Sequence, residues 1–425
     1  MHRLRFSASG ASLTSLPAED LLWRPVGLAS SVDTSLGPRL EGLGPVPAMN
    51  VDFVRLAALV FFCDRTVKRP WNLRRTFELE VAVSDPKCWS VQAKRISALL
   101  SLLTGDAWTL RFASRRQPRL GQIADLPDHD LVLLFSGGSD SACGAITATG
   151  EGLQPLLGSH ADWTATTGAQ NRVIEAIEDA ADCALDQAHW QFGRKETQVG
   201  SAAEFGDERS RRSRSLLFLA LGAAISGASG KPLWVAENGF TSLNPPLVPE
   251  SVGALSTRTT HPAFLRGVGE LLAEVGIPLA LNDKFAQQTK GEMFAEAKRT
   301  LGAAKAAKIL RASHSCGKPP QGVKRVAPET HCGVCYGCLV RRSAFIAAGL
   351  ADGTRYADQV VAKSDRKKYL SPKRMATFRA IQHRLEIGFN EEDVLNLGLP
   401  NDADLDSALD LIQRGLAELA TVKIE

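Results

Sequence analysis

Residues 131–141 read Leu-Val-Leu-Leu-Phe-Ser-Gly-Gly-Ser-Asp-Ser. The first five form a short apolar run, which is typical of a buried strand, and the small residues after Ser141 favour the start of a helix. Two glycines between these elements allow a tight turn with converging backbone N–H groups, and the helix start adds partial positive charge. The segment 136–141 therefore predicts a phosphate-binding loop.

This segment contains several hydrogen-bond donors and one acid. The residues expected to contact phosphate are Ser136, Gly137, Gly138, Ser139 and Ser141. Because a carboxylate repels phosphate, Asp140 is expected to hold the Mg²⁺ that accompanies a nucleotide. A glycine turn without a ligand is the alternative, and the full Ser-Gly-Gly-x-Asp-Ser pattern after a strand argues against it. The pattern resembles the PP-loop of ATP pyrophosphatases, which implies binding of ATP and transfer of adenylate to a substrate oxygen.

After residue 131 the chain alternates between strand and helix patterns. The expected strands are 131–135, 154–158, 189–193, 233–237 and 277–281. The expected helices are 142–150, 169–186, 213–227, 263–275 and 291–309. This alternation predicts an α/β fold with a doubly wound parallel sheet, in which ligands bind beyond the carboxyl ends of the strands.

The pattern also predicts a division of the chain into domains. Residues 1–115 are expected to form an N-terminal α+β domain, and the polar, proline-containing residues 116–130 a linker. Residues 131–350 carry the PP-loop sheet and a cysteine cluster. Residues 351–425 are charge-dense and are expected to form a helical C-terminal region.

Composition limits the class of protein. The 425 residues are 44% hydrophobic and 23% charged, which is ordinary for a globular protein. The net charge of +4 is too small to indicate a nucleic-acid partner by itself. The apolar run Leu56–Cys63 is too short to span a membrane, and no apolar segment follows the basic N-terminus. We therefore expect a cytoplasmic protein.

Four of the eight cysteines lie close together in the sequence. They are Cys316, Cys332, Cys335 and Cys338. Four thiolates suit a closed, structural Zn²⁺ site, and the glycines between the last three ease the bends of the chain. An iron–sulfur cluster uses the same ligands, and His314 or His331 could replace a thiol. The alternative, four reduced thiols in a loop, would be prone to oxidation.

Two basic residues are further candidates for the phosphate site. The segment Thr289–Glu292 has the spacing of a capping box, which places Lys290 at the start of a helix. Its ammonium could contact phosphate, or it is an exposed first-turn lysine. Arg214 ends a basic run that could bind a triphosphate or carboxylate, lie in solvent, or contact nucleic acid. Glu237 and Asn238 end an expected strand and have no motif of their own.

Residues 130–350 resemble the 7-cyano-7-deazaguanine synthases, the QueC family. The matching segments are Ser136–Ser141, Ser213–Leu219, Thr289–Glu292, and Cys316 with Cys332–Arg341. The resemblance implies that the loop binds ATP, that the four cysteines bind zinc, and that Arg214 and Lys290 approach the nucleotide. These enzymes adenylate the carboxylate of 7-carboxy-7-deazaguanine, form an amide with ammonia, and use a second ATP to dehydrate the amide to a nitrile.

The sequence departs from this family in three places. Only a trace of the family's Asp-Tyr-Gly-Gln segment remains at 168–172, Ser215 stands where the family has Asn, and extra regions precede residue 131 and follow residue 350. With these regions the chain resembles the longer QueC-like proteins of bacterial Qat antiphage systems. That resemblance implies transfer of the activated 7-deazaguanine to an amine of a partner protein from the same operon, docked on the N-terminal domain.

Three functions remain open at this point. They are a QueC-like adenylating enzyme of a defence system, a nitrile synthase of queuosine or archaeosine biosynthesis that uses ammonia, and a non-catalytic nucleotide-binding subunit. The intact loop at 136–141 argues against the third. Thiolation of tRNA would need a pair of cysteines near the loop, where Cys143 stands alone. The sequence does not identify the acceptor, the partner, the oligomeric state or the task of residues 351–425.

Overall fold

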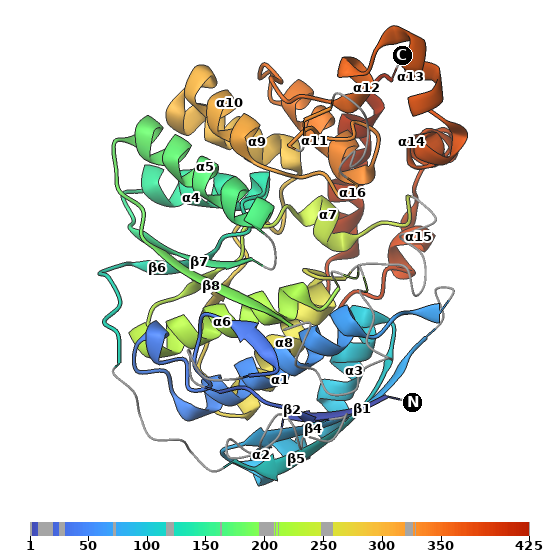
Figure 1. Cartoon of the computed structure of the whole chain (residues 1–425). Helices are drawn as coiled ribbons and strands as arrows, with labels where there is room; N and C mark the ends of the chain where they lie inside the picture. Colours follow the sequence, from blue (N-terminus) through green and yellow to red (C-terminus); the bar gives the residue numbers. More distant parts are fainter. Residues whose placement is uncertain are drawn as a thin grey trace.

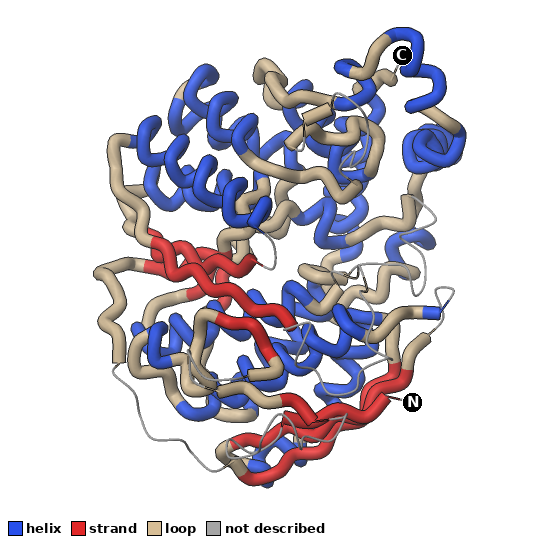
Figure 2. The backbone as a smooth tube through the Cα atoms, viewed as in Figure 1, coloured by secondary structure: helices blue, strands red, loops and turns tan. Residues whose placement is uncertain are grey.

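Two β-sheets and the helices around them organise the chain. The computed structural model describes residues 2–6, 20–24, 30–70, 74–115, 123–161, 164–194, 208, 210, 212–247, 258–318, 326–327 and 329–424. One layer of helices lies between the two sheets, and a second layer covers the far face of the second sheet (Figure 1). In the tube view the strands of both sheets are red and the helices of both layers are blue (Figure 2).

The first sheet has the strand order β2-β1-β4-β5, and its described pairings are all parallel. Its strands are β1 His2–Phe6, β2 Asp20–Leu21, β4 Thr76–Val83 and β5 Ala107–Ser114. The helices of this part are α1 Ala48–Thr66, α2 Pro86–Val91 and α3 Ala93–Thr104. Every second residue of β4 is buried, so this strand packs one face against a core, as its alternating sequence predicts.

The second sheet has the order β10-β9-β6-β7-β8-β3. Its strands are β6 Leu131–Leu134, β7 Pro155–Ala161, β8 Gln187–Arg194, β9 Leu233–Trp234, β10 Leu281–Asn282 and β3 Val32–Thr34. The first five are parallel, and β3 is antiparallel. The chain runs outward from β6 to β8 and then returns to β9 on the other side of β6. The topological switch point therefore lies between β6 and β9.

Helices cover both faces of this sheet, which confirms a mixed α/β fold with a parallel sheet. On one face lie α6 Arg214–Ser229 and α8 Pro262–Glu274, which share a core with α1 and α3. On the other lie α4 Ser139–Gly150, α5 Thr164–Ala181, α9 Lys290–Leu301 and α10 Ala303–Ala312. The expected single helix 291–309 is thus two helices, separated at Gly302.

Residues before position 115 also contribute to the second sheet and to the helix layer that covers it. Strand β3 pairs with β8 at the edge of the second sheet, and α1 packs on α6. The core between the sheets mixes side chains of both parts, such as Phe62 and Leu217. The domain boundaries at residues 115 and 350 stay predictions, and the described contacts join the parts into one packed body.

The C-terminal region is helical. Its helices are α12 Ala357–Val360, α13 Lys363–Tyr369, α14 Pro372–Ile387, α15 Glu391–Leu395 and α16 Leu405–Ala420. Two helices from earlier in the chain, α7 Gly239–Leu243 and α11 Tyr336–Ala347, lie beside them. Helices α7, α11, α14, α15 and α16 bury a separate apolar cluster around Ile412. Across the described part of the chain, no helix combines the length and the apolar character needed to cross a bilayer.

Candidate functional site

The loop after β6 turns directly into helix α4. Gly138 is the residue before the first turn, and the first amides of a helix have no acceptor within it. Gly137 has a φ of +76°, and a Cβ atom there would lie 3.0 Å from the backbone nitrogen of Gln170 on α5. Because glycine alone meets both conditions without strain, the turn depends on this residue.

Serine hydroxyls gather at the start of α4. The Oγ atom of Ser136 accepts a hydrogen bond from the Gly138 amide at 3.3 Å and lies 3.4 Å from the Oγ atom of Ser141. The Oγ atom of Ser139 accepts a hydrogen bond from the Lys290 ammonium at 3.3 Å. Hydroxyls, helix amides and an ammonium group together suit a phosphate. Contact of these residues with a nucleotide stays a prediction.

Asp140 is held between a cation and an amide. Its Oδ1 atom lies 2.8 Å from the Lys290 ammonium, and both side chains are only 10% exposed. Its Oδ2 atom accepts a hydrogen bond of 3.0 Å from the side-chain amide of Asn238. The structure thus brings together two of the predicted site residues, Asp140 and Lys290. Lys290 is buried and does not point into solvent from the first turn of its helix.

Glu237 beside Asp140, and Asp283, which acts on Glu237, both have a raised pKa. Burial raises the pKa of Glu237 to about 8, and the negative charge of Asp140 contributes in the same direction while Lys290 opposes it. Burial raises the pKa of Asp283 to about 7. Oxygen ligands are those that Mg²⁺ prefers, and a cation between Asp140 and Glu237 would relieve the repulsion between them. The donor set therefore fits the magnesium role predicted for Asp140.

Arg214 lies at the topological switch point. It is the first residue of α6, its guanidinium donates a hydrogen bond of 3.4 Å to the carbonyl of His160, and it lies 4.9 Å from the ring centre of Phe218. It borders a cavity of about 190 Å³ at the carboxyl ends of β6 and β9. Ser136 and Glu237 border the same cavity. Arg214 and Ser136 of the loop therefore face one shared space.

A larger cavity is lined in part by His314, which contacts the loop. It measures about 680 Å³ and is enclosed by α5, α10 and the residues next to the cysteines. His314 borders it, and the backbone N–H of His314 donates a hydrogen bond of 3.0 Å to the carbonyl of Gly137. Its lining mixes charges of both signs, with four basic residues (Arg172, Lys308, Arg311 and Arg355) and three acidic ones (Glu175, Asp179 and Glu329).

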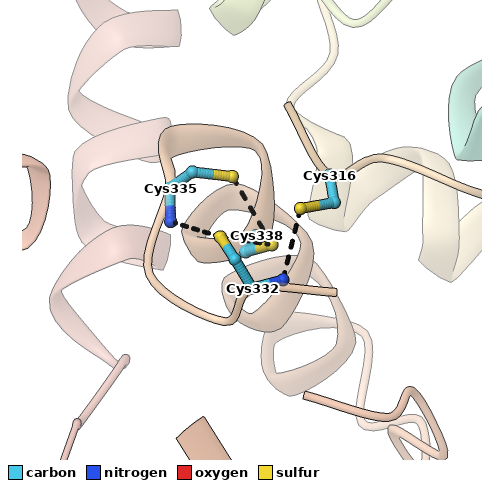
Figure 3. Close-up of side chains that lie close together, drawn as sticks. All are labelled: Cys316, Cys332, Cys335 and Cys338. Carbon is cyan, nitrogen blue, oxygen red and sulfur yellow. Dashed lines mark hydrogen bonds between the residues drawn. The ribbon is translucent and has the colours of Figure 1, made fainter. Parts of the chain in front are cut away.

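The four clustered cysteines meet in space. Their sulfur atoms all lie within 4.8 Å of one another, and all four residues are buried (Figure 3). The sulfur of Cys338 is 3.8 Å from that of Cys332 and 3.5 Å from that of Cys335. Four sulfurs around one Zn²⁺ at about 2.3 Å stand about 3.8 Å apart, so this cluster fits a tetrahedral zinc site. A structural role follows because the set leaves no position for a substrate.

Hydrogen bonds connect the residues of the cysteine cluster. The amide of Cys332 donates to the sulfur of Cys316 at 3.2 Å, and the amide of Cys335 donates to the sulfur of Cys332 at 3.3 Å. Hydrogen bonding within the cluster, led by Cys316, holds the pKa of Cys335 far below its usual range. Among the described residues, the group with metal-ligand geometry contains no histidine. The rings of His314 and His331 instead pack edge to face, 4.7 Å apart.

A buried arginine joins the cysteine cluster to the loop. Arg341 on α11 donates hydrogen bonds from Nη1 to the hydroxyls of Ser313 (2.9 Å) and Ser315 (3.4 Å). The hydroxyl of Ser315 in turn lies 3.2 Å from that of Ser139 in the loop. The cysteine cluster therefore fixes the segment before Cys316 beside the loop 136–141.

For several residues of the site, the sequence does not indicate which partner they contact. Asn238 follows an expected strand, but nothing in its neighbourhood indicates Asp140 as its partner. Ser313 and Ser315 are ordinary polar residues until Arg341 is placed beside them. Arg341 itself belongs to the cysteine motif, and its position three residues after Cys338 is the signal that could have found this link.

Comparison with known proteins gives one informative match. No protein-family model matches the chain. A curated protein named 7-cyano-7-deazaguanine synthase 1, from Sphingopyxis alaskensis, is 38% identical over 104 residues. The matched part is 23% of this chain and 41% of the relative, so the chain spans less than half of that protein's length. Over this part the chain is similar to a 7-cyano-7-deazaguanine synthase.

Proposed function

We propose that this chain is an ATP-dependent ligase of the QueC type with a PP-loop fold. It would adenylate the carboxylate of a 7-deazaguanine and pass the acyl group to a nitrogen nucleophile. The observation that carries the proposal is the Lys290–Asp140–Asn238 contact at the N-terminus of α4, inside the Ser-Gly-Gly-x-Asp-Ser loop. The name of the Sphingopyxis relative supports the substrate class.

The chemistry follows from the groups around the loop. The amides and hydroxyls of residues 136–141 would bind the phosphates of ATP, and the Lys290 ammonium would offset the charge that develops at the attacked phosphorus. Mg²⁺ held by Asp140 would supply further charge neutralisation when bound. A carboxylate oxygen of the substrate attacks the α-phosphorus, the bond to the bridging oxygen breaks, and pyrophosphate leaves. The acid is now a mixed anhydride with AMP as its leaving group.

The second half of the reaction needs a nitrogen nucleophile. The nitrogen attacks the carbonyl carbon, AMP leaves with the electrons of the C–O bond, and the nitrogen loses a proton. The small cavity beside Ser136 suits the acid, because Arg214 offers a guanidinium to its carboxylate and Phe218 an apolar wall. Within the proposal, Arg214 therefore binds the acid, and the loop binds ATP.

The proposed nucleophile is an amine of a partner protein in an antiphage defence system. The regions before residue 131 and after residue 350, which exceed a minimal nitrile synthase, support this choice. Residues 1–115 would dock the partner through surfaces other than the face of α1 that packs on α6. The second candidate is a synthase of 7-cyano-7-deazaguanine that uses ammonia, and the printed name of the relative favours it.

Mass spectrometry of the products separates these functions. The protein is incubated with ATP, Mg²⁺ and 7-carboxy-7-deazaguanine, with and without ammonia and with and without the protein encoded beside it. A partner protein that gains the mass of the deazaguanine acyl group supports the first function. Free nitrile supports the second. Folded, zinc-loaded protein that releases no AMP under any of these conditions refutes both and leaves a nucleotide-binding subunit.

A further inference from the structure

Both direct partners of Asp140 stand at the start of a helix. Lys290 is the first residue of α9, and Asn238 is the residue that caps the N-terminus of α7. The position of each partner therefore depends on how its helix is held. Helix α16, close to the C-terminus of the chain, packs against α7 and bonds to α9 through the side chains of Glu418 and Arg414.

Glu418 on α16 binds the residues on either side of Lys290. Its carboxylate accepts a hydrogen bond of 3.1 Å from the Gly291 amide, and it also accepts one from the hydroxyl of Thr289. An acidic group at this place is favoured by the partial positive charge of the helix start. Burial raises the pKa of Glu418, and both hydrogen bonds oppose that change.

An ion pair between α16 and α9 extends this contact. The Nη1 atom of Arg414, one turn before Glu418, lies 2.5 Å from both carboxylate oxygens of Glu292. Its Nη2 atom donates a hydrogen bond of 3.1 Å to the carbonyl of Gln287. Two side chains of α16 thus hold the chain before and within the first turn of α9.

The sequence at the contact is adapted to close approach. A Cβ atom at Gly291 would collide with the carboxylate of Glu418 and would lie 2.8 Å from the Cβ atom of Ala347. On its other side α16 packs against α7, where Leu411 and Phe240 share one apolar cluster. One helix of the C-terminal region therefore braces both elements that hold Asp140.

We propose that Glu418 is a positioning residue of the phosphate site, which acts by fixing Lys290 against Asp140 and Ser139. The proposal rests on the proposed function for the part that Lys290 plays in the reaction. It gives residues 351–425 a task, since a chain without α16 would leave the start of α9 without its acidic partner. On this proposal the PP-loop region alone is not sufficient for full activity, because it lacks helix α16.

A double-mutant cycle tests the proposal. Glu418→Gln keeps the size of the side chain and replaces one acceptor oxygen by a donor, and Asp406→Asn, an exposed acid on the same helix, is the control. We expect Glu418→Gln to lower the rate of AMP release about 10- to 100-fold, with zinc content and melting temperature near those of the control. In a Lys290→Ala background the same change should have no further effect, because the group it positions is gone.

Two results would overturn the proposal. Equal rate losses from Glu418→Gln in the wild-type and Lys290→Ala backgrounds would show that Glu418 acts independently of Lys290. A crystal structure of the Glu418→Gln variant in which Lys290 still lies 2.8 Å from Asp140 would also overturn the proposal. This structural test can be made even if the wild-type protein releases no AMP. If the wild-type protein releases no AMP, the proposed function is refuted. The position of Lys290 in the variant structure then still tests whether Glu418 positions it.

Discussion

Asp64 accepts two hydrogen bonds from Ser213, the residue directly before Arg214. Its Oδ2 atom lies 3.2 Å from the Ser213 amide and 2.8 Å from the Ser213 hydroxyl. The other oxygen of Asp64 lies 2.5 Å from Arg75, which also pairs with Asp106 at 2.7 Å. A buried network from the N-terminal part thus holds the start of α6, where the cavity-lining arginine stands.

Asp64→Asn is expected to destabilise the protein by about 3 kcal/mol, because it leaves the buried guanidinium of Arg75 with one of its two charged partners. Denaturant unfolding measures the change. Glu274→Gln is the matched control, since Glu274 pairs with Arg95 at the surface and both side chains are well exposed. The control should change stability by about 0–1 kcal/mol. Equal effects of the two substitutions would contradict the assigned importance of the network.

Asp140→Asn is expected to lower ATP-dependent AMP release at least about 100-fold, because the neutral side chain holds neither Lys290 nor a divalent cation with the same strength. Circular dichroism and zinc content should stay unchanged. Glu386→Gln, at an exposed acid of α14, serves as the control and should keep full activity. Wild-type turnover by the Asp140→Asn protein would contradict both roles assigned to Asp140, the binding of Mg²⁺ and the contact with Lys290.

Cys335→Ser is expected to lose the bound zinc and much of the stability, because binding of a structural metal is coupled to folding. Metal analysis of purified protein and thermal unfolding with and without a chelator measure both effects. Cys183→Ser, at a half-buried thiol outside the cluster, should retain one zinc per chain. Full zinc content in the Cys335→Ser protein would show that the ligand set is different.

Stability is expected to fall as pH rises from about 4.5 to about 8, owing to Glu237. Its pKa is raised to about 8 in the folded protein, so the folded state keeps a proton that the unfolded state releases above about 4.5. The contribution is therefore complete at low pH and is lost as the pH rises through this window, by up to about 1.4 kcal/mol per pH unit. Denaturant unfolding at several pH values measures it.

The comparison is with Glu237→Gln, which cannot titrate. Its stability should change less between pH 5 and pH 8 than that of the wild-type protein. Asp283 acts in the same direction, because its pKa is raised to about 7, so some pH dependence remains in the variant. Parallel curves for wild type and variant would mean that Glu237 is ionised in the folded state.

Local patterns allowed much of this fold to be predicted. The strand before Ser136, the capping box at Thr289 and the cysteine spacing each involve neighbours in sequence, and the structure has β6, α9 and the sulfur cluster at these places. Partners distant in sequence were not predictable. Asp64, Asn238 and Glu418 act on residues 98 or more positions away, which only packing brings into contact.

The short elements also escaped prediction, for a physical reason. Strand β10 has two residues at Leu281–Asn282 and the expected strand was 277–281, because an edge strand needs only a few backbone hydrogen bonds when its neighbour is fixed. Strand β3 lies in a segment without periodicity, and its place beside β8 depends on the edge that β8 presents. Such pairings follow from the completed sheet more than from their own side chains.

The antiparallel strand at Val32–Thr34 has a further consequence. It occupies the outer backbone groups of β8, which would otherwise form an open edge of the six-stranded sheet. Open edges recruit strands from other molecules. A shortened protein that starts after residue 40 should therefore self-associate, and light scattering would show larger particles at concentrations where the whole chain stays dispersed.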